Sequence, residues 1–87
     1  MRLVETAKFK RLRKKLKQEQ EKTELKKAIL NIAENPNVGK KLKGEFKDLM
    51  SIKYSIKGQS RRLIYKIEQE TIVLFSFGPR EGIYKKN

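Results

Sequence analysis

The chain has 87 residues, of which 37% are hydrophobic, and its 23 Lys and Arg residues outnumber its 10 Asp and Glu residues to give a net charge of +13. This length allows one modest hydrophobic core, so we expect a single domain over residues 1–87, and the charge predicts an acidic or polyanionic partner. Cysteine and histidine are absent, which excludes disulfides, thiolate metal sites and histidine-dependent catalysis, and we expect neither a metal nor a cofactor.

The first part of the chain predicts two helices. Thr6 is a candidate N-cap, because its hydroxyl can accept an amide proton of the first turn. Beyond it, apolar residues recur every three or four positions, at Phe9, Leu12 and Leu16. Residues 18–22 are polar and suggest a turn, although they contain no strong breaker and one long helix remains open. A second apolar stripe then ends before Pro36 and comprises Leu25, Ala28, Ile29, Ile32 and Ala33.

The first predicted helix is unusually basic. Residues 8–17 contain seven basic residues and no acidic one, and like charges three and four positions apart destabilise an isolated helix. These side chains either form a solvated face or contact an RNA backbone or an acidic protein. The contact residues we expect in the second case are Lys10, Arg13, Lys14 and Lys17.

The second part of the chain predicts strands. Residues 37–48 are expected to be a connecting loop that turns at Gly44 and is held to the core by Leu42 and Phe46. From residue 49 the pattern alternates: Met50, Ile52, Tyr54 and Ile56 point one way, and Ser51, Lys53, Ser55 and Lys57 point the other.

Two further strands follow after turns at residues 57–60 and 68–70. In the first of them, Leu63, Tyr65 and Ile67 share one face, and Arg62, Ile64, Lys66 and Glu68 share the other. Residues 72–77 are apolar on both faces, which is typical of a more central strand.

Helices followed by a strand meander predict an α+β fold. We expect two antiparallel N-terminal helices packed on one face of a small, mostly antiparallel twisted sheet. That sheet would contain the three-strand meander and a short N-terminal edge strand at residues 2–5, although these four residues could instead lead into the first helix. No apolar run approaches the ~20 residues that span a bilayer, and the first ten residues lack a secretory signal, so we expect a cytoplasmic protein with no membrane contact.

The sheet face away from the helices is predicted to be basic, with Ser51, Lys53, Arg62 and Lys66 on it. Arg80 and Tyr84 follow the last strand in a segment that contains Gly78-Pro79 and Gly82. Guanidinium groups bind phosphate oxygens well, and an exposed tyrosine ring can stack on an unpaired base. Each group also has an ordinary structural role open to it: Arg62 could pair with Glu68 or Glu70, and Arg80 with Glu81 or a C-terminal carboxylate. Tyr84 could lie in the core.

Four segments of the sequence together resemble the RelE/ParE superfamily of bacterial toxins from type II toxin–antitoxin pairs. They are KKL at residues 14–16, KKLKGEFKDL at 40–49, RRLIYKI at 61–67 and FGPREGIY at 77–84. The resemblance covers nearly the whole chain. It implies a ribosome-dependent, metal-independent mRNA endoribonuclease (an mRNA interferase) that inhibits translation and is neutralised by an acidic antitoxin wrapped around it.

By position, the resemblance implies a catalytic set of Lys53, Arg62, Arg80 and Tyr84. It implies further RNA contacts at Lys43, Lys47, Ser51, Lys66 and Lys85, and contact of the basic helix with the ribosome or the antitoxin. The family pattern pairs two lysines on the strand before Arg62, and Ser51 stands where the second would fall.

The chemistry implied is attack of the RNA 2′-hydroxyl on its own phosphate, which leaves a 2′,3′-cyclic phosphate. Arg62 and Arg80 suit stabilisation of the phosphorane, since arginine binds phosphate but transfers protons poorly. Lys53 is our candidate base, and either Arg80 or Tyr84 would be the acid. Two rival functions share the fold or the charge: a ParE-like inhibitor of DNA gyrase, and a non-catalytic module that binds RNA or the ribosome.

Overall fold

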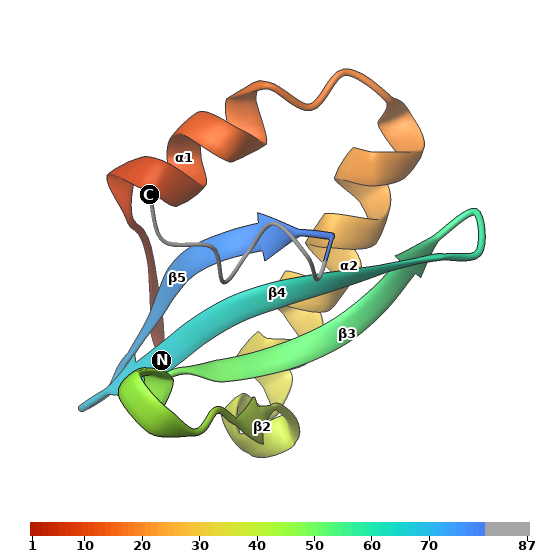
Figure 1. The fold of residues 1–87 in the computed structure, drawn as a ribbon. Helices are drawn as coiled ribbons and strands as arrows, with labels where there is room; N and C mark the ends of the chain where they lie inside the picture. Colours follow the sequence, from red (N-terminus) through yellow and green to blue (C-terminus); the bar gives the residue numbers. More distant parts are fainter. Residues whose placement is uncertain (80–87) are drawn as a thin grey trace.

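The protein is described by a computed structural model covering residues 1–79, except for the side chain of Phe46. Five strands form one sheet in the order β1-β5-β4-β3-β2, and two helices cover one of its faces (Figure 1). In chain order the elements are β1 (Arg2–Glu5), α1 (Ala7–Lys14), α2 (Glu19–Glu34), the 3-10 turn η1 (Pro36–Val38), β2 (Lys40–Lys41), the 3-10 turn η2 (Gly44–Phe46), β3 (Met50–Ile56), β4 (Gln59–Glu68) and β5 (Thr71–Gly78). The predicted α+β fold is confirmed.

The two predicted helices are separate, with residues 15–18 between them. Thr6 caps α1, because its hydroxyl accepts the Phe9 amide proton at 3.1 Å. α2 ends at Glu34, two residues before Pro36, as the sequence predicts. It runs back in roughly the opposite direction to α1, and α1 packs against β5 while α2 packs against β3 (Figure 1).

The predicted meander is also confirmed. β3 and β4 form an antiparallel hairpin whose turn holds Lys57 and Gly58 at positive φ (51° and 80°), and this conformation matches the twist of the flanking strands. β5 pairs with β4 on one side and with β1 on the other. This central position explains why its apolar residues lie on both faces.

One feature of the sheet differs from the sequence prediction. Residues 37–48 are not a plain loop, because Lys40 and Lys41 pair with β3 as a fifth strand. The predicted N-terminal edge strand is confirmed; it forms the opposite edge of the sheet and runs parallel to β5. Leu42 is partly buried, as expected of a residue that holds this segment to the core, whereas the side chain of Phe46 lies outside the described part of the structure.

The core lies between the helices and the sheet, and Tyr65 at its centre has no exposed surface. Its hydroxyl donates to the Pro36 carbonyl oxygen at 2.7 Å and accepts the Gly39 amide proton at 3.0 Å. A Cβ added at Gly39 would meet the Tyr65 hydroxyl and lie 2.9 Å from the Ser51 carbonyl oxygen. The buried tyrosine therefore holds the chain between α2 and β2 against the sheet.

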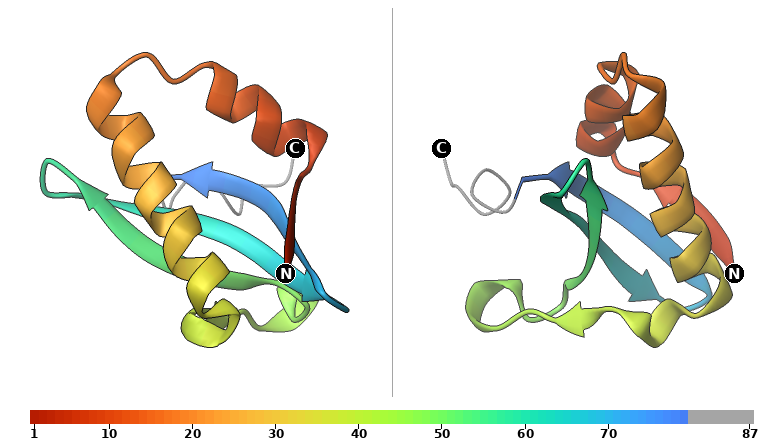
Figure 2. Two further views of the ribbon diagram at one scale, coloured as in Figure 1. Left: turned by 180° about the vertical axis from the view of Figure 1, so that it is seen from behind. Right: turned by 90° about the vertical axis from the view of Figure 1, so that its right-hand side faces the viewer.

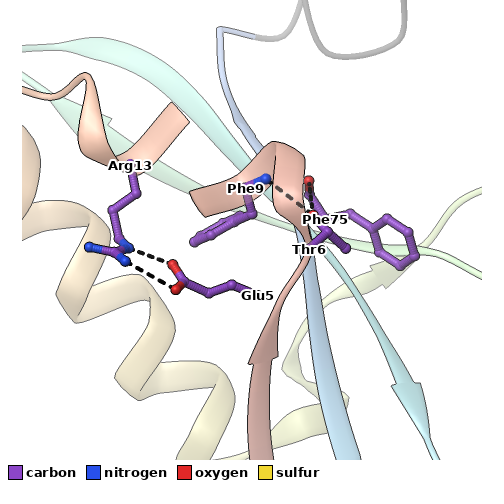
Figure 3. Close-up of polar contacts among 5 residues, drawn as sticks. All are labelled: Glu5, Thr6, Phe9, Arg13 and Phe75. Atoms are coloured by element: carbon purple, nitrogen blue, oxygen red, sulfur yellow. Dashed lines mark hydrogen bonds and ion pairs between the residues drawn. The ribbon is translucent and has the colours of Figure 1, made fainter. Parts of the chain in front are cut away.

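The start of α1 is fastened to β1 and β5 (Figure 3). Thr6 donates from its hydroxyl to the Phe75 carbonyl oxygen at 3.1 Å and from its amide to the Leu74 carbonyl oxygen at 3.0 Å. The Arg13 guanidinium donates to both carboxylate oxygens of Glu5, and this pairing holds the pKa of Glu5 below its ordinary value of 4.5. Among residues 1–79, no helix is long and apolar enough to cross a membrane.

We predict that Tyr65→Phe destabilises the protein by about 1–3 kcal/mol, since it leaves the partly buried Gly39 amide and Pro36 carbonyl without their partner. Urea unfolding followed by circular dichroism measures this loss. Tyr54→Phe is the matched control, because the Tyr54 hydroxyl makes no hydrogen bond to the described residues. Burial raises the pKa of Tyr54 to about 12, so this substitution also removes an uncharged hydroxyl. Equal effects of the two substitutions would contradict the role of Tyr65.

The ion pair between Glu5 and Arg13 should make stability depend on pH. A carboxylate whose pKa is lowered in the folded state stabilises that state above its unfolded pKa, and the effect is lost as pH falls through the folded pKa. We therefore expect Glu5→Gln to melt at a lower temperature than the wild type at neutral pH, and the difference to disappear on acidification well below pH 4.5. Glu34→Gln removes the same charge from an exposed carboxylate and should show no such convergence.

Candidate functional site

The alternation of β3 and β4 brings two cations together on the sheet face away from the helices. Lys53 lies directly opposite Arg62 in the β3–β4 ladder, and Arg62 lies opposite Gly78 at the end of β5. The expected pairing of Lys53 with Arg62 on this open face is therefore present. Arg61, which precedes Arg62 in β4, points to the helix side, where it donates to the Gln59 amide oxygen at 3.2 Å.

This pair of cations is unfavourable for folding. Like charges directly opposite on neighbouring strands repel, and among residues 1–79 no carboxylate forms an ion pair with either side chain. The Nε of Arg62 is buried and has no hydrogen-bond partner among residues 1–79, while its Nη1 reaches the Ser51 hydroxyl only at 3.5 Å. An unmatched guanidinium donor beside an ammonium group is suited to an anion such as a phosphate.

The next rung of the face is nearly closed to solvent. Ser51, Ile64 and Ser76 lie across the sheet from one another, with 4%, 2% and 6% of their surfaces exposed. Ser51 was expected to contact RNA directly. Its burial and its hydrogen bond to Arg62 mean instead that any effect it has on a ligand is exerted through the position of that guanidinium.

Lys66 occupies the third rung, opposite Val73, and an aromatic ring lies near its ammonium group. Its Nζ lies 3.5 Å from a Glu68 carboxylate oxygen and 5.8 Å from the centre of the Phe75 ring. Glu68, one of the two carboxylates that could have neutralised Arg62, is thus paired with Lys66.

The remaining predicted contact residues fall into separate groups. Lys43 and Lys47 are exposed beside η2, in a segment that lies on the side of the sheet away from the helices (Figure 2). Lys10, Lys14 and Lys17 are exposed on the helix side, and Arg13 is engaged with Glu5. Three predicted residues lie outside the described part of the chain: Arg80, Tyr84 and Lys85. Both candidates for the general acid, Arg80 and Tyr84, are among them.

A groove of about 570 Å³ lies between the two helices on the far side of the core. Its apolar lining consists of Leu16, Leu25, Ile29 and Leu30, and its basic lining consists of Arg13, Lys14, Lys22 and Lys26. Leu30 is 51% exposed, and no acidic residue lines the groove. The molecule therefore presents two basic surfaces, one on each side of its sheet.

Sequence reasoning missed two residues of the open face. Lys40 pairs with Ser51 across the β2–β3 ladder, and a two-residue strand leaves no periodic signal that would reveal this. Phe75 was assigned only to an apolar strand, although a register shift turns it onto the basic face. The described residues contain no group of acidic side chains that could hold a metal ion.

Comparison with known proteins assigns the fold. A family model described as the ParE-like toxin of type II bacterial toxin–antitoxin systems matches residues 3–87, and comparison with curated proteins gives no match. The isolated E. coli RelE toxin is similar in structure, with a TM-score of 0.72 at 24% identity over 90% of this chain and 82% of that one.

Two complexes are also similar. A mutant of E. coli RelE bound to an antitoxin RelB peptide has a TM-score of 0.72 at 26% identity, over 93% of this chain and 84% of that one. The RelBE2 toxin–antitoxin complex of Mycobacterium tuberculosis has a TM-score of 0.62 at 24% identity, over 91% and 96% of the two chains. Because the family model matches nearly the full length of the chain, the chain belongs to the ParE-like toxins of type II bacterial toxin–antitoxin systems.

Proposed function

We propose that this toxin is a metal-independent endoribonuclease that cuts mRNA on the ribosome, in the cytoplasm, with its open sheet face as the active site. The observation that carries the proposal is the Arg62 guanidinium, whose buried Nε lacks a partner in the described part of the chain and which faces Lys53 across the ladder. An inhibitor of DNA gyrase with the same fold would not need this pair of cations, which repel each other in the absence of an anion.

In the proposed reaction the RNA 2′-oxygen attacks the adjacent phosphorus while the bond from phosphorus to the 5′-oxygen breaks. Lys53 in its neutral form takes the proton of the 2′-hydroxyl, and a second group donates a proton to the leaving 5′-oxygen. Arg62 stabilises the negative charge that develops on the phosphorane, which is often the largest catalytic contribution. The products are a 2′,3′-cyclic phosphate and a 5′-hydroxyl.

Arg80 and Tyr84 are proposed to complete the site, Arg80 on the phosphate and Tyr84 against the base. Arg80 is two positions after Gly78 in the sequence, and Gly78 lies opposite Arg62. Because Ser51 stands where the family pattern places a second lysine, Lys53 is the only one of the paired lysines that β3 supplies. Cleavage of free RNA should therefore be slow, and correct orientation of the mRNA by the ribosome would supply much of the rate.

We predict that Arg62→Gln lowers the rate of mRNA cleavage by at least about 100-fold, since it removes the main donor to the phosphorane. Arg61→Gln is the matched control: it makes the same change one residue away on the opposite face of β4, and should leave cleavage near the wild-type rate. Mapping of the cut 5′ ends on ribosome-bound mRNA after induction of the toxin measures cleavage by both arginine variants. Lys53→Gln should also abolish most cuts.

Persistent mRNA cuts by Arg62→Gln would show that this face is not the active site. Intact mRNA together with DNA breaks after wild-type induction would instead favour gyrase inhibition. Ribosome binding without any cut would favour a non-catalytic binder, in which substitution of Lys10, Lys14 and Lys17 would do the greater damage.

We further propose that an acidic antitoxin binds the groove between α1 and α2. The apolar floor suits the apolar side of an amphipathic helix, and the basic rim, which includes Lys14 and Lys26, suits acidic residues on its flanks. The RelE neighbour with an antitoxin RelB peptide supports a partner of this kind.

We predict that Leu30→Glu weakens binding of the antitoxin encoded beside this toxin by at least about tenfold, since it places a carboxylate on the apolar floor. Isothermal titration of the purified pair measures the affinity. Val38→Glu is the control, because Val38 is similarly exposed (42% against 51% for Leu30) but lies outside the groove. Cleavage of mRNA by Leu30→Glu should be unchanged, and equal binding of both variants would place the antitoxin elsewhere.

A further inference from the structure

A bulge in β5 turns an aromatic ring onto the basic face. Tyr65 pairs with Leu74 and Ile64 pairs with Ser76, so Phe75 has no partner in the ladder. Leu74 faces the core, hence Phe75 faces away from it, and Ser76 shares the open face of its partner Ile64. Two successive residues of β5 therefore point to the same side as Arg62.

The ring of Phe75 does not belong to the hydrophobic core. Phe75 is partly exposed and is not among the apolar residues packed on the core cluster, whereas Phe77 packs edge-on against Phe9 with ring centres 5.1 Å apart. Figure 3 shows the Phe75 side chain on the opposite side of β5 from α1. Core packing therefore does not account for an aromatic residue at this position.

The backbone beneath the ring is firmly held. The carbonyl groups of Leu74 and Phe75, at the point where the ladder is interrupted, accept the amide and hydroxyl protons of Thr6, and the same hydroxyl caps α1. A bulge anchored to a helix terminus presents its side chain in a fixed direction, so little conformational entropy is lost when a ligand stacks on it.

The contact between Lys66 and the Phe75 ring is weak. A distance of 5.8 Å from the ring centre is near the limit of about 6 Å for a cation–π contact, and Glu68 competes for the same ammonium group. A stacked base can therefore replace Lys66, whose charge then becomes available to a phosphate. Along β4, alternate residues are ~6.5–7 Å apart, so Lys66 is two such steps from Arg62, with the buried Ile64 between them.

We propose that Phe75, with Lys66 beside it, is a stacking site for an unpaired nucleobase of the same RNA strand whose phosphate is bound by Arg62. This inference rests on the proposed function, because it assumes that single-stranded RNA occupies the open face. Stacking on an aromatic ring tolerates every base and follows stacking strength, so purines should be preferred at this position over pyrimidines.

The test uses the full-length toxin and a non-cleavable 2′-O-methyl hexanucleotide carrying the fluorescent base 2-aminopurine at each position in turn. Wild type and Phe75→Tyr should both quench the fluorescence at one position, because stacking quenches this base. Phe75→Leu keeps the apolar bulk but removes the aromatic ring. It should abolish that quenching and weaken binding by about 5- to 150-fold, the equivalent of about 1–3 kcal/mol per stacked base.

An abasic site at the quenched position is the matched change in the ligand. It should weaken wild type and Phe75→Tyr but add little to Phe75→Leu, since both changes remove the same contact. Full additivity, or equal quenching by Phe75→Leu and wild type while Arg62→Gln loses binding, would overturn the stacking site and leave the proposed nuclease intact. Failure of the wild type to bind the hexanucleotide would also overturn the stacking site, whereas the proposed nuclease is tested separately by the cuts mapped on ribosome-bound mRNA. Thermal unfolding of Phe75→Leu near the wild-type temperature confirms that the variant is folded.

Discussion

The two-residue period of β4 is the constraint on which the remaining structure depends. Its side chains enter two different environments in turn: Leu63 and Tyr65 are fully buried beneath the helices, while Arg62 and Lys66 lie on the opposite face. A shift of one residue in its pairing would exchange these sets and bury two cations. The Tyr65 hydroxyl, held by Pro36 and Gly39, keeps this register tied to the segment between α2 and β2.

The same register has an electrostatic cost that the fold does not relieve. A chain of 87 residues with a net charge of +13 has a small core with which to offset self-repulsion, yet it places Lys53 opposite Arg62 and leaves the Arg62 Nε unpaired. Glu68 does not relieve this repulsion, because it lies six positions from Arg62 along β4 and pairs with Lys66. Arrangements that lower stability at a surface are expected where a ligand supplies the missing interaction.

Thr6 links the two sides of the molecule. Its hydroxyl begins α1, whose far end borders the groove between the helices, and the same hydroxyl binds the carbonyl of the Phe75 bulge on the sheet. Thr6 thus connects the start of the basic helix to the bulge on the sheet, although the sheet and core separate the two basic surfaces. This separation would allow the two proposed partners, an acidic antitoxin and RNA, to occupy different faces.

Local pattern in the sequence determined the two helices, the Thr6 cap, the hairpin turns and the faces of β3 and β4, and from these it placed Lys53 beside Arg62. Each of these depends on residues close together in the chain, whose spacing alone defines a helical or extended face. Tertiary structure alone decided that β1 runs parallel to β5, that Lys40 joins the sheet, that Ser51 is buried and that Phe75 turns outward. The reason is that strand partners and bulges are set by contacts between segments distant in the chain. A strand of two residues, or a continuous apolar run, has no periodic pattern from which its partners can be inferred.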